Sequence, residues 1–236
     1  MKVRVKFKKY GPIRFIGHLD VMRFFQKAIR RAELDIAYSA GFSPHQIMSF
    51  AAPLGVGLES NGEYMDIELT TVTTSQDMMA RLNAVSAPGI EVIGMKEIPE
   101  GAGNAMASVA AAGYTIRFRE GRALSVDLKE KLPQFLAQEQ ILITKETKKS
   151  TLEVDLKPGI YEFRVKEDGS LYLLVDASSA GNIKPATVIE AMAEFFGESL
   201  QENALLITRE ETYTNLAKPN KKRRLVPLDA IGTDIV

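Results

Sequence analysis

The first nine residues alternate between apolar and basic side chains, and this limits what the start of the chain can fold into. Val3, Val5 and Phe7 occupy every second position, and the positions between them are Lys or Arg. Successive side chains of a strand point to opposite faces of its sheet, so the pattern predicts a half-buried strand over residues 2–9. One face of that strand should enter a core, and the other should be basic.

A helix is predicted after this strand, over about residues 18–32. At about 100° per residue its apolar side consists of Met22, Phe25, Ile29 and Ala32. Its other side carries a narrow stripe of charges: Asp20, Arg23, Lys27, Arg30 and Arg31. Phe24 falls beside this stripe and not in the middle of the apolar side.

Strands and helices continue to alternate along the rest of the chain. In the first half we expect strands near 36–39, 63–70 and 90–98, and a helix over 75–86 that a Thr/Ser cap opens. In the second half we expect strands over 113–119, 141–147, 151–156, 160–166, 171–175 and 205–213, and helices over 126–137 and 185–196. The pattern predicts an α+β fold of two tandem ferredoxin-like (βαββαβ) halves.

The domain boundaries expected from this pattern follow the turn-forming residues. The first half, with the basic helix and a long loop, should cover 1–98, and the second half 108–215. The stretch 99–108, PEGAGNAMAS, contains Pro99, Gly101 and Gly103 and is typical of a linker. Residues 216–236 contain the run KPNKKRR and are expected to form a basic C-terminal tail.

The chain contains no cysteine. This excludes disulfides, thiolate metal ligands, cysteine nucleophiles and a cysteine-bound iron–sulfur cluster, and it fits a reducing cytoplasm. No apolar run approaches the roughly 18 residues of a membrane span. The alternating N-terminus is unlike a leader segment, so we expect an unprocessed, cytoplasmic protein.

The net charge of zero conceals a strong local imbalance. Residues 1–35 contain ten Lys and Arg against three Asp and Glu, whereas the chain as a whole has 30 of each kind. Clustered cations on one helix can follow a phosphate backbone, because each neutralised phosphate releases counterions. The candidate phosphate or nucleic-acid contacts are Arg14, Arg23, Lys27, Arg30 and Arg31, with Phe24 as a candidate for stacking on a base. The alternative is a solvated helix face, with Phe24 in the core.

A loop of unusual length follows the basic helix, from residue 38 to residue 62. It contains several apolar residues, so disorder is not expected, and its glycines permit close backbone approach to a ligand. It contains neither of the glycine-rich phosphate-binding patterns. The residues of interest, with the start of the next strand, are Tyr38, Ser39, Gly41, Phe42, Ser43, Pro44, His45, Ser60 and Glu63. The loop could equally cover the sheet, and we expect Glu63, Asp66 and Glu68 to be mostly solvated.

Both histidines of the chain, His18 and His45, lie between residues 14 and 66. Either could act as a general base, donate to a phosphate or hold a structural hydrogen bond. His18 with Asp20 could serve acid–base cleavage of RNA. The spacing fits no established metal-ligand pattern, so no metal site is expected. The catalytic candidates are therefore His18, His45 and Asp20, beside a purely structural or binding role.

The segments RFIGHLDVMRFF, AIRRAEL, YSAGFSPHQIMSFAAPLGVG and ESNGEYMDIEL resemble a known family, the radical-SAM-linked domain of unknown function. That domain occurs alone or fused to the C-terminus of cobalamin-binding radical SAM proteins. The resemblance is dense from residue 14 to 66 and weak afterwards. The positions that carry it are His18, Asp20, Arg23, Arg30, Arg31, Ser39, Gly41, Phe42, Pro44, His45, Phe50, Pro53, Leu54, Gly55, Ser60, Glu63 and Asp66.

The resemblance implies a radical SAM protein as partner. That partner would carry the iron–sulfur cluster, S-adenosylmethionine and cobalamin, since this chain lacks the CxxxCxxC motif and holds no cofactor of its own. Genes of the family often lie near those for ribonuclease G and ribosomal proteins, which implies a connection to RNA. A tandem ferredoxin-like architecture is also similar to that of CRISPR RNA-processing endonucleases.

Three functional hypotheses follow. The first is an RNA-binding or substrate-presenting module that acts with a radical SAM partner. The second is an RNA-processing enzyme that uses His18 or His45. The third is a protein–protein adaptor that docks through the apolar part of the long loop.

Overall fold

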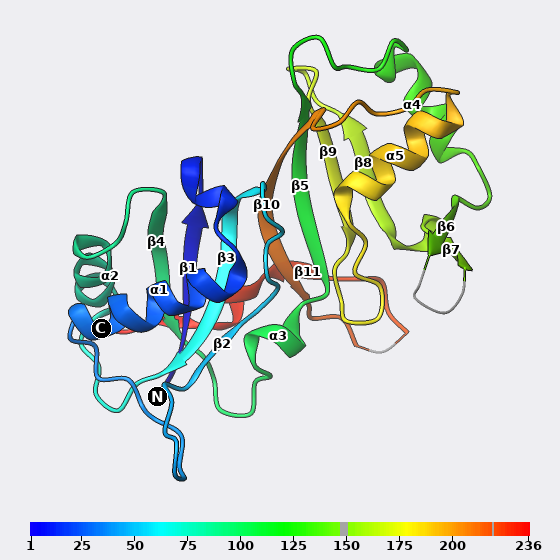
Figure 1. The fold of residues 1–236 in the computed structure, drawn as a ribbon. Helices are drawn as coiled ribbons and strands as arrows, with labels where there is room; N and C mark the ends of the chain where they lie inside the picture. The colour runs from blue at the N-terminus through cyan, green and yellow to red at the C-terminus, as the bar shows by residue number, and fades with distance from the viewer. Residues whose placement is uncertain (147–150, 219) are drawn as a thin grey trace. The chain divides into compact units, whose positions relative to one another are not determined.

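The computed structural model describes residues 1–146, 151–218 and 220–236 (Figure 1). They form two compact units. Unit 1 consists of Met1–Ala110 and Arg209–Val236, and unit 2 of Ala111–Thr208. The chain thus leaves unit 1 once and returns to it, whereas the sequence predicted boundaries at 98, 108 and 215.

Unit 1 is built on a sheet with two main helices. Its elements before the chain leaves are β1 (Lys2–Lys9), η1 (Gly11–Phe15), α1 (His18–Arg31), β2 (Met48–Phe50), β3 (Glu59–Glu68), α2 (Ser75–Ala84), β4 (Ile90–Glu97) and α3 (Ala105–Ser108). Its elements after the return are most of β10 (Leu205–Asn215), then β11 (Leu225–Pro227), η3 (Leu228–Ile231) and β12 (Thr233–Asp234). The strand order is β12-β4-β1-β3-β10, with β2 paired to β3 and β11 to β10.

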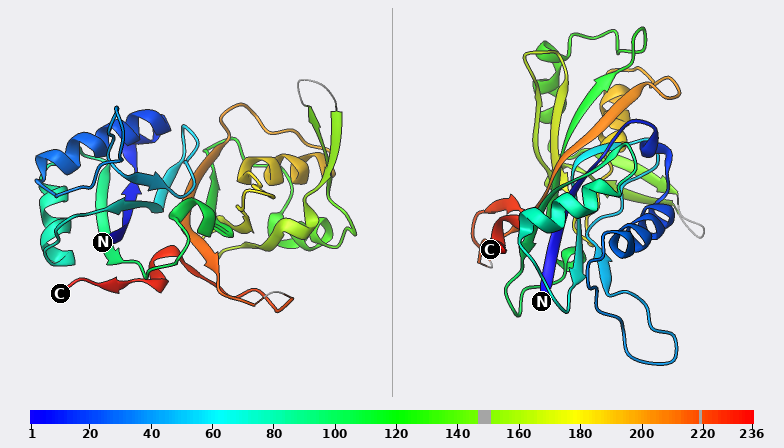
Figure 2. Two further views of the ribbon diagram at one scale, coloured as in Figure 1. Left: turned by 90° about the horizontal axis from the view of Figure 1, so that it is seen from below. Right: turned by 90° about the vertical axis from the view of Figure 1, so that its left-hand side faces the viewer.

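The core of unit 1 lies between the sheet and its helices. The apolar side of β1 (Val3, Val5, Phe7) is buried against Phe25 and Ile29 of α1, as the alternation predicted. Residues of α2 and β4 complete the same cluster: Met78, Leu82, Val92 and Met95. Each large side chain removed from water here contributes about 1.5–3 kcal/mol. Helices α1 and α2 therefore cover one face of the sheet (Figure 2).

The opposite face of this sheet is polar and is covered by the C-terminal segment (Figure 2). Arg4 is fully buried there, with Asp66 of β3 directly opposite it in the β1–β3 register. Residues 216–236, expected as a tail, instead include β11, which pairs with β10, and β12, which pairs with the free side of β4. The basic run lies in the connection from β10 to β11, and its Pro219 is outside the described residues.

Local sequence explains several element boundaries. Helix α2 begins where the side chain of Thr74 accepts a hydrogen bond from the amide of Asp77, which confirms the predicted cap. The strand expected over 36–39 is reduced to two isolated bridges, Ile36 with Leu69 and Tyr38 with Gln46. Because each bridge joins only one pair of residues, residues 36–39 do not form a regular β-strand.

Unit 2 consists of strands and two α-helices. Its elements are β5 (Ala111–Phe118), α4 (Leu128–Leu136), β6 (Leu142–Glu146), β7 (Thr151–Asp155), η2 (Lys157–Gly159), β8 (Ile160–Val165), β9 (Leu171–Asp176), α5 (Pro185–Phe195) and the start of β10. The strand order is β10-β5-β9-β8, and β6 and β7 form a separate hairpin. Residue 147, the predicted end of β6, lies outside the described residues.

The described residues form a mixed structure of strands and five α-helices, with most strands in one large sheet. This agrees with the predicted combination of helices and strands, while two tandem ferredoxin-like halves stay a prediction. In the part of the chain that the structure covers, none of the helices has the length and apolar character to cross a membrane.

Candidate functional site

The basic stripe of α1 faces solvent. Arg23, Lys27, Arg30 and Arg31 are all exposed on this helix. Arg23 pairs with Asp20 at 3.2 Å, where both side chains are about two-thirds exposed, and Arg31 donates to the carbonyl of Val85, just after α2, at 3.0 Å. Arg30 donates to the carbonyl of Gln26, one turn back on the same helix. The stripe therefore presents charge to solvent without being neutralised by a buried carboxylate.

Phe24, the proposed stacking residue, lies beside the stripe but is not free of the core. Its ring is half-buried, packs against the apolar cluster and meets the ring of Phe25 edge-on at 5.2 Å. Its structural role is therefore established by packing, and only part of its surface is left for a ligand.

Arg14 belongs to a different place from the stripe. Its Nη1 donates to Glu59 Oε1 at 3.1 Å, and its guanidinium lies 4.9 Å from the ring of Phe15. The same carboxylate oxygen accepts from the amide of Gly11. This contact joins the turn after β1 to the start of β3, so Arg14 has a structural partner in another segment of unit 1.

The first part of the long loop is an exposed turn held by Ser39 and His45. The amide of Ser39 donates to the carbonyl of His45 at 2.8 Å, and its hydroxyl lies 2.8 Å from His45 Nδ1. Gly41, Phe42, Ser43 and Pro44 at the tip are exposed, and Gly41 has a φ of 108°, which favours glycine.

The rest of the loop is packed into unit 1: it contains β2, which pairs with β3, and apolar residues that close the core, as the alternative interpretation expected of an apolar cover. Phe50, Ala51 and Leu54 are buried, and the hydroxyl of buried Ser60 accepts from the amide of Gly62. The long loop is thus an exposed tip followed by an apolar cover.

His18 lies at a small cavity at the start of α1. Its ring meets Phe50 edge-on at 5.1 Å. The cavity has a volume of about 10 Å³, enough for about one water molecule. Its lining residues are Phe7, Lys9, His18, Val21, Phe50, Pro53, Leu54 and Glu63. Asp20 contacts Arg23 and His45 contacts Ser39, so the three catalytic candidates occupy different surroundings.

Two charged side chains of this cavity, Lys9 and Glu63, belong to a buried ionic cluster. Glu63 is 6% exposed and accepts from Arg209 Nη1 at 2.8 Å, so the expectation that it is solvated was wrong. A carboxylate enters an interior when a partner and hydrogen bonds offset its desolvation, and Arg209 supplies both. Burial lowers the pKa of Lys9, the charge of Glu63 opposes this, and the charge of Arg209 adds to it.

The Lys9–Glu63–Arg209 cluster holds two surface segments in place. Lys9 Nζ donates to the carbonyl of Ile16 at 2.7 Å, and Arg209 Nη1 donates to the carbonyl of Ala52 at 2.7 Å. The two segments are also joined directly, by the amide of Gly57 and the carbonyl of Arg14. They display apolar side chains to solvent, which we call the apolar rim: Tyr10, Phe15, Ile16, Leu19 and Val56.

Sequence reasoning missed the roles of Lys9 and Arg209. Lys9 was counted with the basic residues of the strand, although its position places it on the same face as Phe7. The alternation of side chains along the strand could have predicted that Lys9 is buried. Arg209 is 146 residues away from Glu63 along the chain, and no local pattern links the two.

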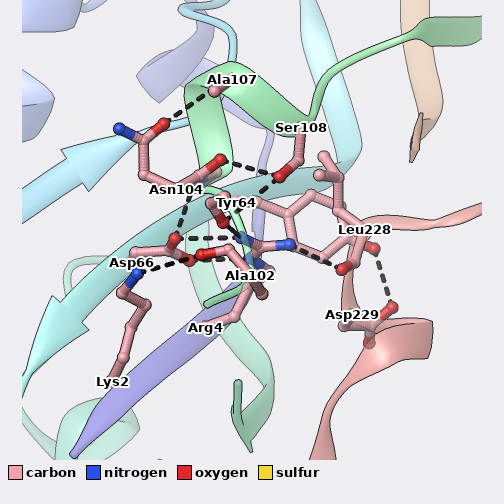
Figure 3. Close-up of polar contacts among 12 residues, drawn as sticks. Lys2, Arg4, Tyr64, Asp66, Ala102, Asn104, Ala107, Ser108, Leu228 and Asp229 are labelled. Atoms are coloured by element: carbon pink, nitrogen blue, oxygen red, sulfur yellow. Dashed lines mark hydrogen bonds and ion pairs between the residues drawn. The ribbon is translucent and has the colours of Figure 1, made fainter. Parts of the chain in front are cut away.

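The polar face of the sheet in unit 1 is closed by a second buried network (Figure 3). Arg4 donates from Nε and Nη2 to the two carboxylate oxygens of Asp66, at 2.7 and 3.0 Å. Its Nη1 donates to the carbonyl of Leu228 at 2.8 Å. Asp66 was also expected to be solvated and is instead buried, since this bidentate pair and the amide of Ala105 satisfy it.

Tyr64 lies beside this network. Its hydroxyl lies between carboxylate oxygens of Glu211 and Asp229, at 2.7 and 3.1 Å. Burial, together with these two acidic neighbours, raises the pKa of the hydroxyl above its usual range. Tyr64 therefore stays neutral and donates a hydrogen bond at any ordinary pH. Within the described residues, no group of three or more His, Cys, Asp and Glu is arranged to hold a metal ion.

The comparison with protein families gives a match over most of the chain. Residues 2–185 match a family described as an uncharacterized protein conserved in bacteria (DUF2344). No curated protein matches the chain. The match spans β1 through the start of α5, so it includes the basic stripe, the exposed loop tip, and both Lys9 and Glu63. Since it covers well over half of the sequence, the chain belongs to the DUF2344 family of bacterial proteins.

Proposed function

We propose that this protein is an RNA-binding or substrate-presenting module that acts with a radical SAM protein. The observation that carries the proposal is the row of exposed cations on α1. Arg23, Lys27 and Arg30 recur at intervals of three or four residues and so lie along one side of the helix. A row of this kind matches a string of phosphates, whose neutralisation releases counterions and favours binding.

The helix, and not the sheet, is the surface that the proposal uses. Many RNA-binding sheets stack bases on aromatic side chains of an open face. In unit 1 the face opposite the helices holds the buried side chain of Arg4, and the aromatic side chain there, Tyr64, is 2% exposed. A base could not stack on that face without displacing the C-terminal segment.

The strand orders support the finer interpretation of the fold. In unit 1 the elements β1, α1, β2, β3, α2 and β4 give the order β4-β1-β3, with β2 on the outer side of β3. In unit 2 the order β10-β5-β9-β8 follows the same plan, with the β6–β7 hairpin as an addition. We therefore interpret each unit as ferredoxin-like.

The partner supplies the chemistry in this proposal. The chain has no cysteine with which to ligate an iron–sulfur cluster. The iron–sulfur cluster, S-adenosylmethionine and cobalamin would therefore reside in the radical SAM protein, in the cytoplasm, and this chain would hold the RNA. Support for this partner comes from the resemblance of residues 14–66 to radical-SAM-linked domains.

The proposal is tested by measuring the affinity for RNA over a range of salt concentrations. Each phosphate contact on single-stranded RNA adds about 0.7 to the slope of log K against log salt. The variant Lys27→Ala/Arg30→Ala should lower that slope by about 1.4. The matched control Arg119→Ala/Lys145→Ala removes two exposed cations from unit 2 and should leave the slope unchanged. Equal slopes for the wild type and the α1 variant would exclude the helix as the phosphate site.

The apolar rim favours a second candidate function, that of an adaptor. Phe15, Leu19 and Val56 are each about 60% exposed, on segments that the buried cluster holds in place. Ordered, exposed apolar side chains are typical of protein contacts. Phe15→Ser/Leu19→Ser should abolish complex formation with the radical SAM partner but leave RNA affinity unchanged. An unaffected complex would remove this candidate.

The third hypothesis, an RNA-processing enzyme, retains His18 and His45 as candidate bases. His18 lines a cavity with Lys9 and Glu63, whereas His45 contacts Ser39 at the surface. If His18 is the base, RNA cleavage by the isolated protein should vanish in His18→Ala and persist in His45→Ala. Cleavage that survives in both variants would eliminate the histidine mechanism.

A further inference from the structure

A shallow groove of about 690 Å³ lies in unit 2 between α4 and β8. Its lining residues are Lys129, Leu132, Pro133, Leu136, Ala137, Phe163, Arg164, Val165, Lys166 and Glu167. The residues that come from β8 and its end are consecutive. Side chains on one face of a strand alternate, so a groove that touches five consecutive residues runs along the backbone edge of the strand.

β8 is the last strand of its sheet among the described residues, because its one neighbour there is β9. The amide of Lys166, at the end of β8, donates to the carbonyl of Ser170, at the start of β9. The backbone polar groups of Lys166 therefore point toward β9. In an antiparallel ladder such hydrogen-bonded pairs recur every second residue. The N–H and C=O groups of Phe163 and Val165 therefore point away from β9, toward the groove.

The groove combines these backbone groups with an apolar floor and cationic sides. Leu132 and Leu136 of α4 and the side chain of Val165 supply apolar contacts. Lys129 at the start of α4 and Lys166 at the end of β8 supply ammonium groups, and with Arg164 they give the lining three cations against the one carboxylate of Glu167. The guanidinium of Arg164 is already engaged, at 2.7 Å from Glu162 and 4.8 Å from the ring of Tyr172.

We propose that this groove binds an extended acidic peptide of a partner protein, which adds to the edge of β8 as a further strand. The outward backbone groups of Phe163 and Val165 would give the peptide its hydrogen bonds. Every second peptide side chain would be apolar and would contact α4. The intervening acidic side chains would point to the opposite face, where the side chain of Lys166 also lies, and Lys129 adds a positive charge on the helix side. This complementarity selects acidic over basic segments.

The test uses a short blocked peptide of alternating valine and glutamate and a second peptide with lysine in place of glutamate. Nuclear magnetic resonance of the full chain should show the amides of Phe163 and Val165 shifting with the acidic peptide. Their hydrogen exchange should slow, because strand addition protects outward N–H groups. The lysine peptide should bind at least about tenfold more weakly.

Two variants separate the proposal from simple loss of folding. Val165→Pro removes an outward donor and should weaken the acidic peptide about tenfold, while Lys145→Ala, an exposed cation of unit 2 outside the groove, serves as a control. Lys129→Glu/Lys166→Glu should reverse the preference toward the lysine peptide, which a misfolded protein could not do.

Three results would overturn the proposal. In the first, the acidic peptide leaves the amide signals of β8 unshifted. In the second, the chain binds the acidic and the lysine peptide with equal affinity. In the third, sedimentation shows that the chain forms a dimer, with β8 of one copy paired to β8 of the other.

Discussion

The two faces of the sheet in unit 1 both bury charge, but with different consequences. On the face away from the helices, Arg4 is matched atom by atom: Nε and Nη2 meet Asp66, and Nη1 meets the carbonyl of Leu228. On the face toward α1, Glu63 pairs with Arg209 next to a small cavity, and its charge also acts on the nearby Lys9. The first network closes a surface, whereas the second supports segments that remain exposed.

This difference shows that buried charge by itself does not mark a functional site. The Arg4–Asp66 pair attaches the C-terminal segment and α3 to the sheet and leaves little room for a ligand. The Lys9–Glu63–Arg209 cluster fixes the carbonyls of Ile16 and Ala52, beneath the apolar rim. Function on this unit is therefore expected at the outer side of α1 and at the rim.

The largest effect should come from breaking the closed network. Asp66→Ala leaves Arg4 as a buried charge without its carboxylate, which should cost about 3–5 kcal/mol of unfolding free energy. Chemical denaturation measures this. The control is Lys8→Ala on the same strand, whose partner Glu91 is 45% exposed, and which should cost less than about 1 kcal/mol. Equal losses in the two variants would contradict the comparison.

A smaller effect is expected at the cluster under the rim. Glu63→Gln keeps the shape and one acceptor but removes the negative charge that pairs with Arg209 and acts on Lys9. The loss of unfolding free energy should be about 1–3 kcal/mol. Hydrogen exchange should accelerate in residues 52–57. Glu68→Gln, exposed on the same strand, is the control, and unchanged exchange in both variants would show that the cluster does not fix this segment.

The pH dependence of stability should distinguish Lys9 from exposed lysines. Since burial lowers the pKa of Lys9 below its ordinary 10.5, the unfolded chain binds this proton more tightly. The contribution of Lys9 to stability should therefore rise with pH between the lowered pKa and about 10.5. Subtracting the Lys9→Met curve from that of the wild type isolates this slope. A slope of the opposite sign would contradict the assigned cause.

The smallest stability change is expected at the exposed stripe of α1. Asp20→Ala removes the ion pair with Arg23, in which both side chains are about two-thirds exposed, and should change stability by less than about 1 kcal/mol. The same change frees a cation and should strengthen RNA binding, as a filter-binding titration can show. The control Glu139→Ala, which removes an exposed carboxylate from unit 2, should change neither the stability nor the RNA affinity. Weaker RNA binding by Asp20→Ala would contradict a purely electrostatic role of the stripe.

The parts of the fold that sequence predicted rest on local periodicity. Alternation located β1, the spacing of Phe25 and Ile29 located α1, and Thr74 located the start of α2. The orientation of the basic stripe was also predictable, because helix geometry separates it from the apolar side.

The missed features depend on distant pairing. Asp66 and Glu63 look like solvated residues until Arg4 and Arg209 are placed opposite them. Arg4 also meets the carbonyl of Leu228, 224 residues further along. The sequence carries no local signal for such contacts, nor for β12, a strand of two residues that forms only because the edge of β4 is available.

The most direct measurement is to cross-link RNA to the protein with ultraviolet light and identify the linked residues by mass spectrometry. The account predicts adducts on α1, from Arg23 to Arg31, and none on Arg4, Tyr64 or Asp66 of the closed face. Adducts on the closed face, or on unit 2 alone, would contradict the proposal that the helix holds the RNA.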